Sequence, residues 1–204
     1  GKIDWACHAN DAATVFQEVI DMDAAVKVAL DFYEKHPDET LIVITADHET
    51  GGIALGTGKY LLNLSVLQYQ KVSKDGLTAK IKKLRKDKDN KVSWEDVQEL
   101  LRENLGFWDQ VALSEGQEKT LKEVYKDSFR GKKVEMEKNL YSSNELLAKE
   151  AIKILDAIAM VGWTSGGHSA GVVPVYAIGA GAELFNGKLD NIDIPRKIAE
   201  AAGY

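Results

Sequence analysis

Residues 41–52 read Leu-Ile-Val-Ile-Thr-Ala-Asp-His-Glu-Thr-Gly-Gly, and this stretch decides the fold class. Its first five residues form a short, continuous run rich in β-branched side chains, which predicts a strand buried on both faces. The two glycines at its end predict a loop. Asp47 and His48 are therefore expected just past the carboxyl end of a buried strand, where open α/β sheets bind ligands.

Further elements along the chain fit an α/β fold. Apolar residues at helical spacing predict a helix over 11–35, and Pro195 in a first turn predicts a short terminal helix over 194–203. The run 172–178 predicts a second strand, with Pro174 near its start indicating an edge position or an irregular first pair. We expect an α/β fold containing part of a mostly parallel sheet flanked by helices.

Charge divides the chain into two kinds of sequence. The 204 residues carry a net charge of −6, yet residues 59–150 hold 19 of the 26 Lys and Arg and only half of the 32 Asp and Glu. We expect residues 59–140 to be a charged helical insertion in a core made of 1–58 and 141–204. The overall acidity argues against a nucleic acid partner, and no apolar run approaches the length of a membrane span. The single cysteine, Cys7, excludes an internal disulfide.

The insertion carries recognisable helix starts. We expect at least three helices within 73–130, two of which begin with capping-box patterns at Ser93 and Ser114. The stretch 87–98 begins like a calcium-binding loop but has Val92 where that loop needs glycine. We therefore interpret this stretch as a charged turn that leads into a capped helix.

Five acidic and imidazole side chains form the candidate site. Asp4 and His8 are four residues apart, a spacing that places two side chains on one face of a helical turn. His168 lies in a glycine-rich loop, where backbone can approach a ligand closely. With Asp47 and His48 they offer the oxygen and nitrogen ligands that zinc takes where cysteine is absent. The alternative is that each histidine is structural or surface-exposed, and on the residues alone both interpretations stay open.

Three motifs then resemble those of the alkaline phosphatases, in the order found in that family. They read Ile-Asp-Trp-Ala-Cys-His-Ala-Asn-Asp at 3–11, Thr-Ala-Asp-His-Glu-Thr-Gly-Gly at 45–52, and Thr-Ser-Gly-Gly-His-Ser-Ala-Gly-Val-Val-Pro-Val-Tyr at 164–176. The tail 179–193 is also similar to the closing segment of the family. The resemblance covers the predicted core on both sides of the insertion.

This resemblance implies a role for each of the five side chains. Asp4, His8 and His168 would hold a first zinc ion, leaving an open position for phosphate or water. Asp47 and His48 would hold a second zinc ion. A magnesium ion would take most of its ligands from outside this chain.

The resemblance also implies a reaction and a setting. The family hydrolyses phosphate monoesters through a phosphoserine, and the parent protein would be a homodimer in the periplasm or secreted. Trp5 would lie near the phosphate, or would simply pack. The serine nucleophile of the family belongs to a segment with no counterpart here. We therefore expect no catalytic residue in this chain, which would be a C-terminal part of the enzyme and inactive alone.

Two alternatives to this prediction stand. The parent could be another member of the same superfamily, a phosphomutase or a sulfatase. The chain could instead be a non-catalytic zinc-binding module.

Overall fold

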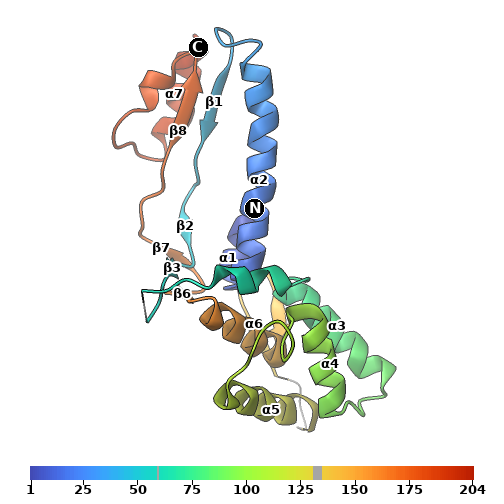
Figure 1. Ribbon diagram of the computed structural model, residues 1–204. Helices are drawn as coiled ribbons and strands as arrows, with labels where there is room; N and C mark the ends of the chain where they lie inside the picture. Colours follow the sequence, from blue (N-terminus) through green and yellow to red (C-terminus); the bar gives the residue numbers. More distant parts are fainter. Residues whose placement is uncertain (59, 131–134) are drawn as a thin grey trace. The chain divides into compact units, whose positions relative to one another are not determined.

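The computed structural model describes residues 1–58, 60–130 and 135–204, and these form two compact units (Figure 1). The first unit combines Gly1–Glu18 with Thr50–Gly167, and the second combines Val19–Glu49 with His168–Tyr204. The predicted insertion, 59–140, falls inside the first unit. Its separation from a core as a distinct domain stays a prediction.

The first unit is mainly helical. Its core contains large side chains with no or almost no exposed surface, among them Leu77, Ile81, Leu101, Leu105, Phe107, Leu147 and Leu155. Those residues come from α3, α4, α6 and the turn after α4, so helices of the charged segment contribute much of this core. The elements of this unit are α1 (Lys2–His8), β3 (Ile53–Leu55), a 3-10 helix (Leu64–Tyr69), α3 (Lys74–Asp87), α4 (Trp94–Leu105), α5 (Glu115–Arg130), β4 (Met136–Lys138), β5 (Ser143–Glu145), α6 (Leu146–Ile158) and β6 (Val161–Trp163).

Local capping sets where these helices begin, as the sequence predicts. The hydroxyl of Ser93 accepts a hydrogen bond from the amide of Asp96, whose carboxylate accepts one from the amide of Ser93. Ser114 and Gln117 make the same reciprocal pair at the start of α5. The stretch that resembles a calcium loop is instead the end of α3, a turn and this Ser93 cap.

The second unit contains most of α2 (Ala12–Tyr33), β1 (Leu41–Ile44), β8 (Tyr176–Gly179), a 3-10 helix (Ala182–Phe185) and α7 (Asp193–Ala201). β1 and β8 pair antiparallel, from Leu41 opposite Gly179 to Ile44 opposite Tyr176. Two further two-residue strands pair with each other, β2 (Glu49–Thr50) and β7 (His168–Ser169). The mixture of helices and strands agrees with the predicted α/β class.

The strands differ from the predicted mostly parallel sheet. The ladders β1·β8, β3·β6 and β4·β5 are all antiparallel and two-stranded. β1 is only half-buried. A continuous β-branched run identifies a strand but carries no information on the direction of its partner, which comes from a distant segment. The second strand begins at Tyr176 and not at Val172, since Pro174 has no N–H with which to pair.

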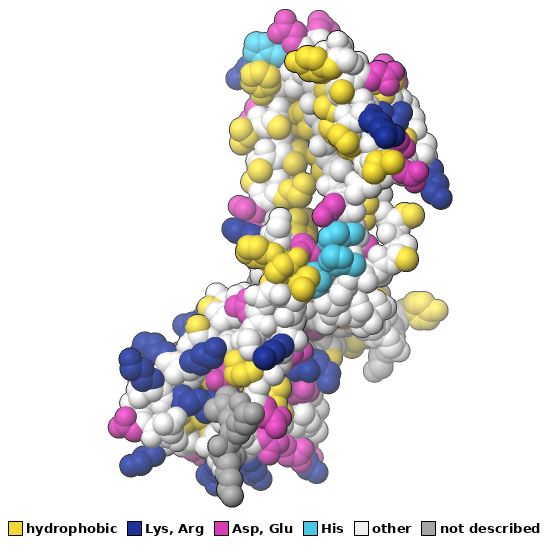
Figure 2. All heavy atoms as spheres, turned by 180° about the vertical axis from the view of Figure 1, so that it is seen from behind, with side chains coloured by type: hydrophobic (Ala, Val, Ile, Leu, Met, Phe, Trp, Pro, Cys, Tyr) yellow, Lys and Arg dark blue, Asp and Glu magenta, His cyan; other side chains and the backbone are white. Residues whose placement is uncertain are grey.

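Surface chemistry separates the two units. Figure 2 shows Lys and Arg side chains over the helical part of the first unit, whereas hydrophobic side chains occupy much of the visible face of the second. Phe185 is the one buried hydrophobic side chain that the described part of the second unit contributes. Several apolar side chains of α2 are more than a third exposed, namely Val19, Ile20, Met22, Val28, Leu30 and Phe32. Among the residues described, no helix is both long and apolar enough to cross a membrane.

A carboxyl group of α6 is buried inside the first unit. Asp156 is 2% exposed, and its Oδ2 accepts hydrogen bonds from the indole Nε1–H of Trp163 at 2.8 Å and from the amide of Ala12 at 3.4 Å. Burial raises the pKa of Asp156 to about 7, with a further upward contribution from the charge of Asp11. The carboxyl group thus binds its proton more tightly in the folded chain than in the unfolded one.

The substitution Asp156→Asn should make folding less dependent on pH. Because the folded pKa lies above the unfolded one, the native protein loses stability as pH rises from about 4 to about 7. Asparagine keeps an acceptor for Trp163 and does not ionise, so we expect Asp156→Asn to gain about 2–4 kcal/mol over the native chain above pH 7. Urea denaturation at pH 5 and pH 8 measures this difference. The exposed Asp127→Asn serves as control, and an equal pH response in both variants would contradict the burial of Asp156.

Candidate metal centre

Helix α1 places two of the predicted ligands together in the first unit. Asp4 Oδ1 lies 3.4 Å from Nε2 of His8, one helical turn away. His8 is buried, with 4% of its surface exposed. The hydroxyl of Thr50 donates a hydrogen bond of 2.6 Å to Asp4 Oδ1 and so holds the carboxylate in place.

The hydrogen bond made by the other ring nitrogen of His8 determines the tautomer of the ring. Nδ1 lies 2.7 Å from the carbonyl oxygen of Gly166. A carbonyl oxygen only accepts, so Nδ1 carries the proton and donates it. In the neutral ring, Nε2 then presents its lone pair beside Asp4. Metal-binding histidines are oriented in this way, with the second ring nitrogen donating to a carbonyl or carboxylate.

The separation of the two ligand atoms fits a zinc ion. Nitrogen and oxygen ligands stand about 2.0–2.2 Å from zinc, so two corners of the tetrahedron are about 3.3–3.5 Å apart. The distance between Asp4 Oδ1 and His8 Nε2 is 3.4 Å, and the distance between Asp47 Oδ2 and His48 Nε2 is 3.3 Å. A lone pair and a carboxylate oxygen at such distances repel each other unless a proton or a cation lies between them.

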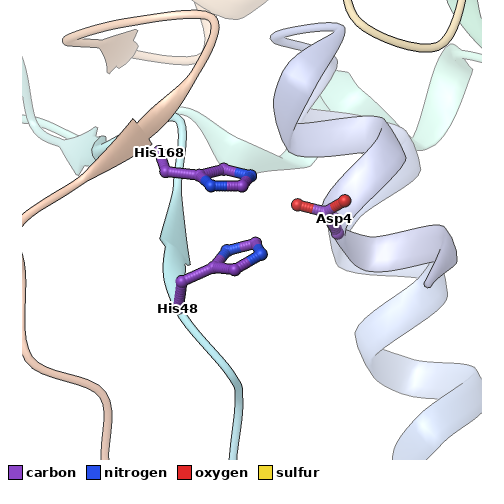
Figure 3. Close-up of side chains that lie close together, drawn as sticks. All are labelled: Asp4, His48 and His168. Carbon is purple, nitrogen blue, oxygen red and sulfur yellow. The ribbon is translucent and has the colours of Figure 1, made fainter.

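The remaining predicted ligands belong to the second unit. His48 directly precedes β2 and His168 opens β7, and their rings stack with centroids 3.5 Å apart and planes at 23°. Figure 3 shows the two rings one above the other, with Asp4 drawn on α1. The side chain of Asp47 is 80% exposed, against 31% for His48.

Within each unit the structure brings some of the five predicted residues together. Asp4 and His8 form one pair in the first unit, whereas His168 stacks on His48 in the second. The stacking of these two rings could not be predicted from the sequence, because it arises from the pairing of β2 with β7, each only two residues long. The assignment of His168 to the same ion as Asp4 and His8 joins residues of two units and stays a prediction.

Within the first unit, Tyr141 lies against two aromatic rings of α1, those of Trp5 and His8. Trp5 is 55% exposed, and its ring centroid lies 5.9 Å from that of Tyr141. Tyr141 also meets the ring of His8 edge-on at 5.1 Å. The sequence singled out Trp5 but missed Tyr141, which is far away along the chain. Cys7 is buried, as expected for a small side chain between Asp4 and His8.

The carboxylate–imidazole pairs at metal-ligand spacing and the mixed α/β architecture are features of a metal-dependent α/β hydrolase. A family model described as alkaline phosphatase matches residues 1–204, the whole chain. The chain therefore belongs to the alkaline phosphatase family, as its three motifs predict.

Individual relatives agree with this assignment. Alkaline phosphatase 3 of Bacillus subtilis is 30% identical over 211 residues, which cover 100% of this chain and 38% of that protein. The repressible alkaline phosphatase of Saccharomyces cerevisiae is 29% identical over 86% of this chain and 29% of its own length. The chain thus spans well under half of these relatives.

Solved structures show the same fold. A cold-active alkaline phosphatase from Shewanella sp. superposes with a TM-score of 0.72 and 28% identity, covering 97% of this chain and 42% of that one. The alkaline phosphatase of Thermus thermophilus gives a TM-score of 0.66 at 23% identity, covering 98% and 41%. The α/β fold class predicted from the sequence is confirmed.

Metal binding through the first pair can be tested with the chain itself. We expect the chain to retain zinc after dialysis against a weak chelator, and His8→Ala to weaken zinc affinity at least about tenfold. Competition with a fluorescent zinc chelator measures the affinity, and circular dichroism checks the fold. The control is His36→Ala, because His36 is exposed and stacks on Phe32. Equal zinc affinity in the two variants would count against His8 as a ligand.

Proposed function

We propose that this chain supplies the metal-binding part of a phosphomonoester hydrolase that works through a phosphoserine. Asp4, His8 and His168 would hold one zinc ion, and Asp47 and His48 a second. The observation that carries the proposal is the pair of Asp4 and His8 at the edge length of a zinc tetrahedron, with the tautomer of His8 set by a backbone carbonyl. Membership of the alkaline phosphatase family supports it.

When bound, zinc would polarise a phosphoryl oxygen and lower the pKa of water. Other residues of the chain orient the side chains of the metal ligands. Gly166 keeps the proton of His8 on Nδ1, and Thr50 donates to the Asp4 oxygen that faces His8, so both ligand atoms stay directed at one point. The indole N–H of the exposed Trp5 would donate to phosphate, directly or through water.

The proposal extends to the protein that contains this chain. The relatives are named alkaline phosphatases, and we infer phosphate monoesters as substrates of that protein. We also propose two zinc ions and one magnesium ion for it, with the magnesium ligands mostly outside these residues. Export to the periplasm or the medium and a homodimeric parent complete the proposal. The serine nucleophile would come from a segment outside residues 1–204.

The longer protein should release inorganic phosphate from 4-nitrophenyl phosphate and from glycerol phosphate. We expect His168→Ala to lower kcat/KM at least about 100-fold, because it removes a ligand of the ion that would stabilise the transition state. His36→Ala is the matched control and should keep full activity. Release of sulfate from 4-nitrophenyl sulfate, or isomerisation without phosphate release, would instead favour the sulfatase or phosphomutase alternative.

The chain on its own should not turn over a phosphate monoester. The expected result is a rate equal to that of buffer containing the same zinc and magnesium. Turnover that survives repurification and disappears in His168→Ala would overturn the prediction that the nucleophile lies elsewhere. Zinc retention by the chain, with no phosphate release by the longer protein, would favour a non-catalytic zinc-binding module.

A further inference from the structure

A second site lies in the first unit, in a cavity of about 350 Å³ next to α6. None of its lining residues is among the predicted metal ligands. The volume is near the lower limit for small-molecule sites, which span about 300–1,000 Å³. The residues that decide its chemistry are Lys74, Glu137, Lys149, Lys153, Asp156 and Trp163.

The cavity wall carries three lysines and two acidic residues. Nζ of the buried Lys74 donates to the carbonyl oxygen of Ala9 at 2.6 Å and contacts Glu137 Oε2 at 2.7 Å. Lys149 contacts the other oxygen of Glu137 at 3.1 Å. Glu137 thus faces two ammonium groups, which lower its pKa although burial acts in the opposite direction. One positive charge of this trio remains uncompensated.

A third lysine of the wall has only a loose ion pair. Lys153 lines the cavity, is 70% exposed and lies 3.7 Å from Glu150, a solvated contact that holds its ammonium group weakly. Lys149 is 43% exposed, so its ammonium group also reaches the open side of the cavity. An anion entering the cavity would therefore meet two lysines whose head groups are not locked in the interior.

Asp156 supplies a polar atom that the protein leaves unsatisfied. Its Oδ2 accepts from Trp163 and Ala12, whereas Oδ1 is buried and has no hydrogen-bond partner among the described residues. Nearly all buried polar atoms in proteins have a partner, so an orphaned one needs an explanation. Asp156 lines the cavity although Oδ1 itself is closed to solvent, so a ligand hydroxyl can provide the missing partner once the carboxyl group turns toward the cavity.

We propose that this cavity binds a small hydroxylated organic anion, with its charged head group on Lys149 and Lys153 and its hydroxyl group on Asp156 Oδ1. The indole of Trp163 and the side chain of Val161 provide an apolar wall for a short carbon chain. The head group is a carboxylate or a phosphate, because both accept hydrogen bonds from ammonium groups. This site is independent of the proposed phosphatase function.

The Trp163 indole reports on the cavity directly, since its Nε1–H is bonded to Asp156. The experiment is NMR of the chain with ¹⁵N-labelled tryptophan, in EDTA to remove zinc. 3-Hydroxybutyrate tests the carboxylate head group, and glycerol 1-phosphate tests the phosphate. We expect a saturable shift of the Trp163 indole signal with at least one probe. The signal is assigned by its loss in Trp163→Phe, and the backbone amide of Trp163, which carries the same label, is a second reporter.

Variants connect the shift to the proposed contacts. Lys149→Met should weaken binding of the responding probe about tenfold, since it removes a charge-assisted hydrogen bond. Lys126→Met, on the exposed surface of α5, is the matched control and should not change the affinity. The proposal is overturned if neither probe shifts the signal, if sodium chloride of equal ionic strength gives the same shift, or if both variants bind equally.

The pH dependence tests the contact with Asp156. Deprotonation adds a negative charge to the site, so 3-hydroxybutyrate should bind about fivefold more weakly at pH 8 than at pH 6. Asp156→Asn should remove this dependence. The other charged groups that face Asp156 or line the cavity are Asp11, Lys74, Glu137, Lys149 and Lys153. A dependence that persists in Asp156→Asn would exclude Asp156 from the contact.

Discussion

The hydrogen bond from His8 Nδ1 to the carbonyl oxygen of Gly166 is the constraint on which the candidate site depends. It ties helix α1 to the glycine loop that leads to His168, across 158 positions of sequence. Asn10 strengthens the tie by donating to the carbonyl oxygen of Ser165, and the amide of Gly51 donates to that of Gly167. Gly51 has a φ of +84°, and a Cβ there would lie 2.8 Å from the Trp163 ring, so only glycine fits. The close approach of Trp163 therefore accounts for the first glycine of the second motif.

The distribution of buried apolar residues suggests that a bound metal would contribute to folding stability as well as to chemistry. Almost the whole buried apolar set lies in the first unit, whereas α7 contains no buried residue and β1 is only half-buried. Asp47, His48 and His168 thus belong to a unit with little core of its own. Binding energy from a metal adds directly to folding stability when the unfolded chain lacks the site. An ion held by these residues would stabilise the second unit more, in proportion, than it would stabilise a well-packed domain.

Local features were predictable, and distant pairings were not. Ser93 and Asp96 are three residues apart and settle the start of α4 by themselves, and the four-residue spacing of Asp4 and His8 is enough to predict that they meet. The stacking of His48 on His168 depends on a strand pairing between segments more than 100 residues apart, for which short strands carry no periodic signal. Asp156 was missed for a related reason. An acidic residue in an amphipathic helix reads as solvent-facing, and its burial comes from Trp163 and from the start of α2.

Two buried carboxyl groups in the first unit, those of Asp11 and Asp156, differ in how fully their oxygens are hydrogen-bonded. Asp11 is 1% exposed, and its two oxygens accept hydrogen bonds from the amides of Thr14 and Lys74 and from the side chain of Gln70. It is thereby committed to joining the starts of α2 and α3. Asp156 is as deeply buried but has donors on one oxygen only. Leaving a buried acceptor without a donor costs about 1–3 kcal/mol, and a ligand hydroxyl in the adjoining cavity would recover that free energy, whereas at Asp11 there is none left to recover.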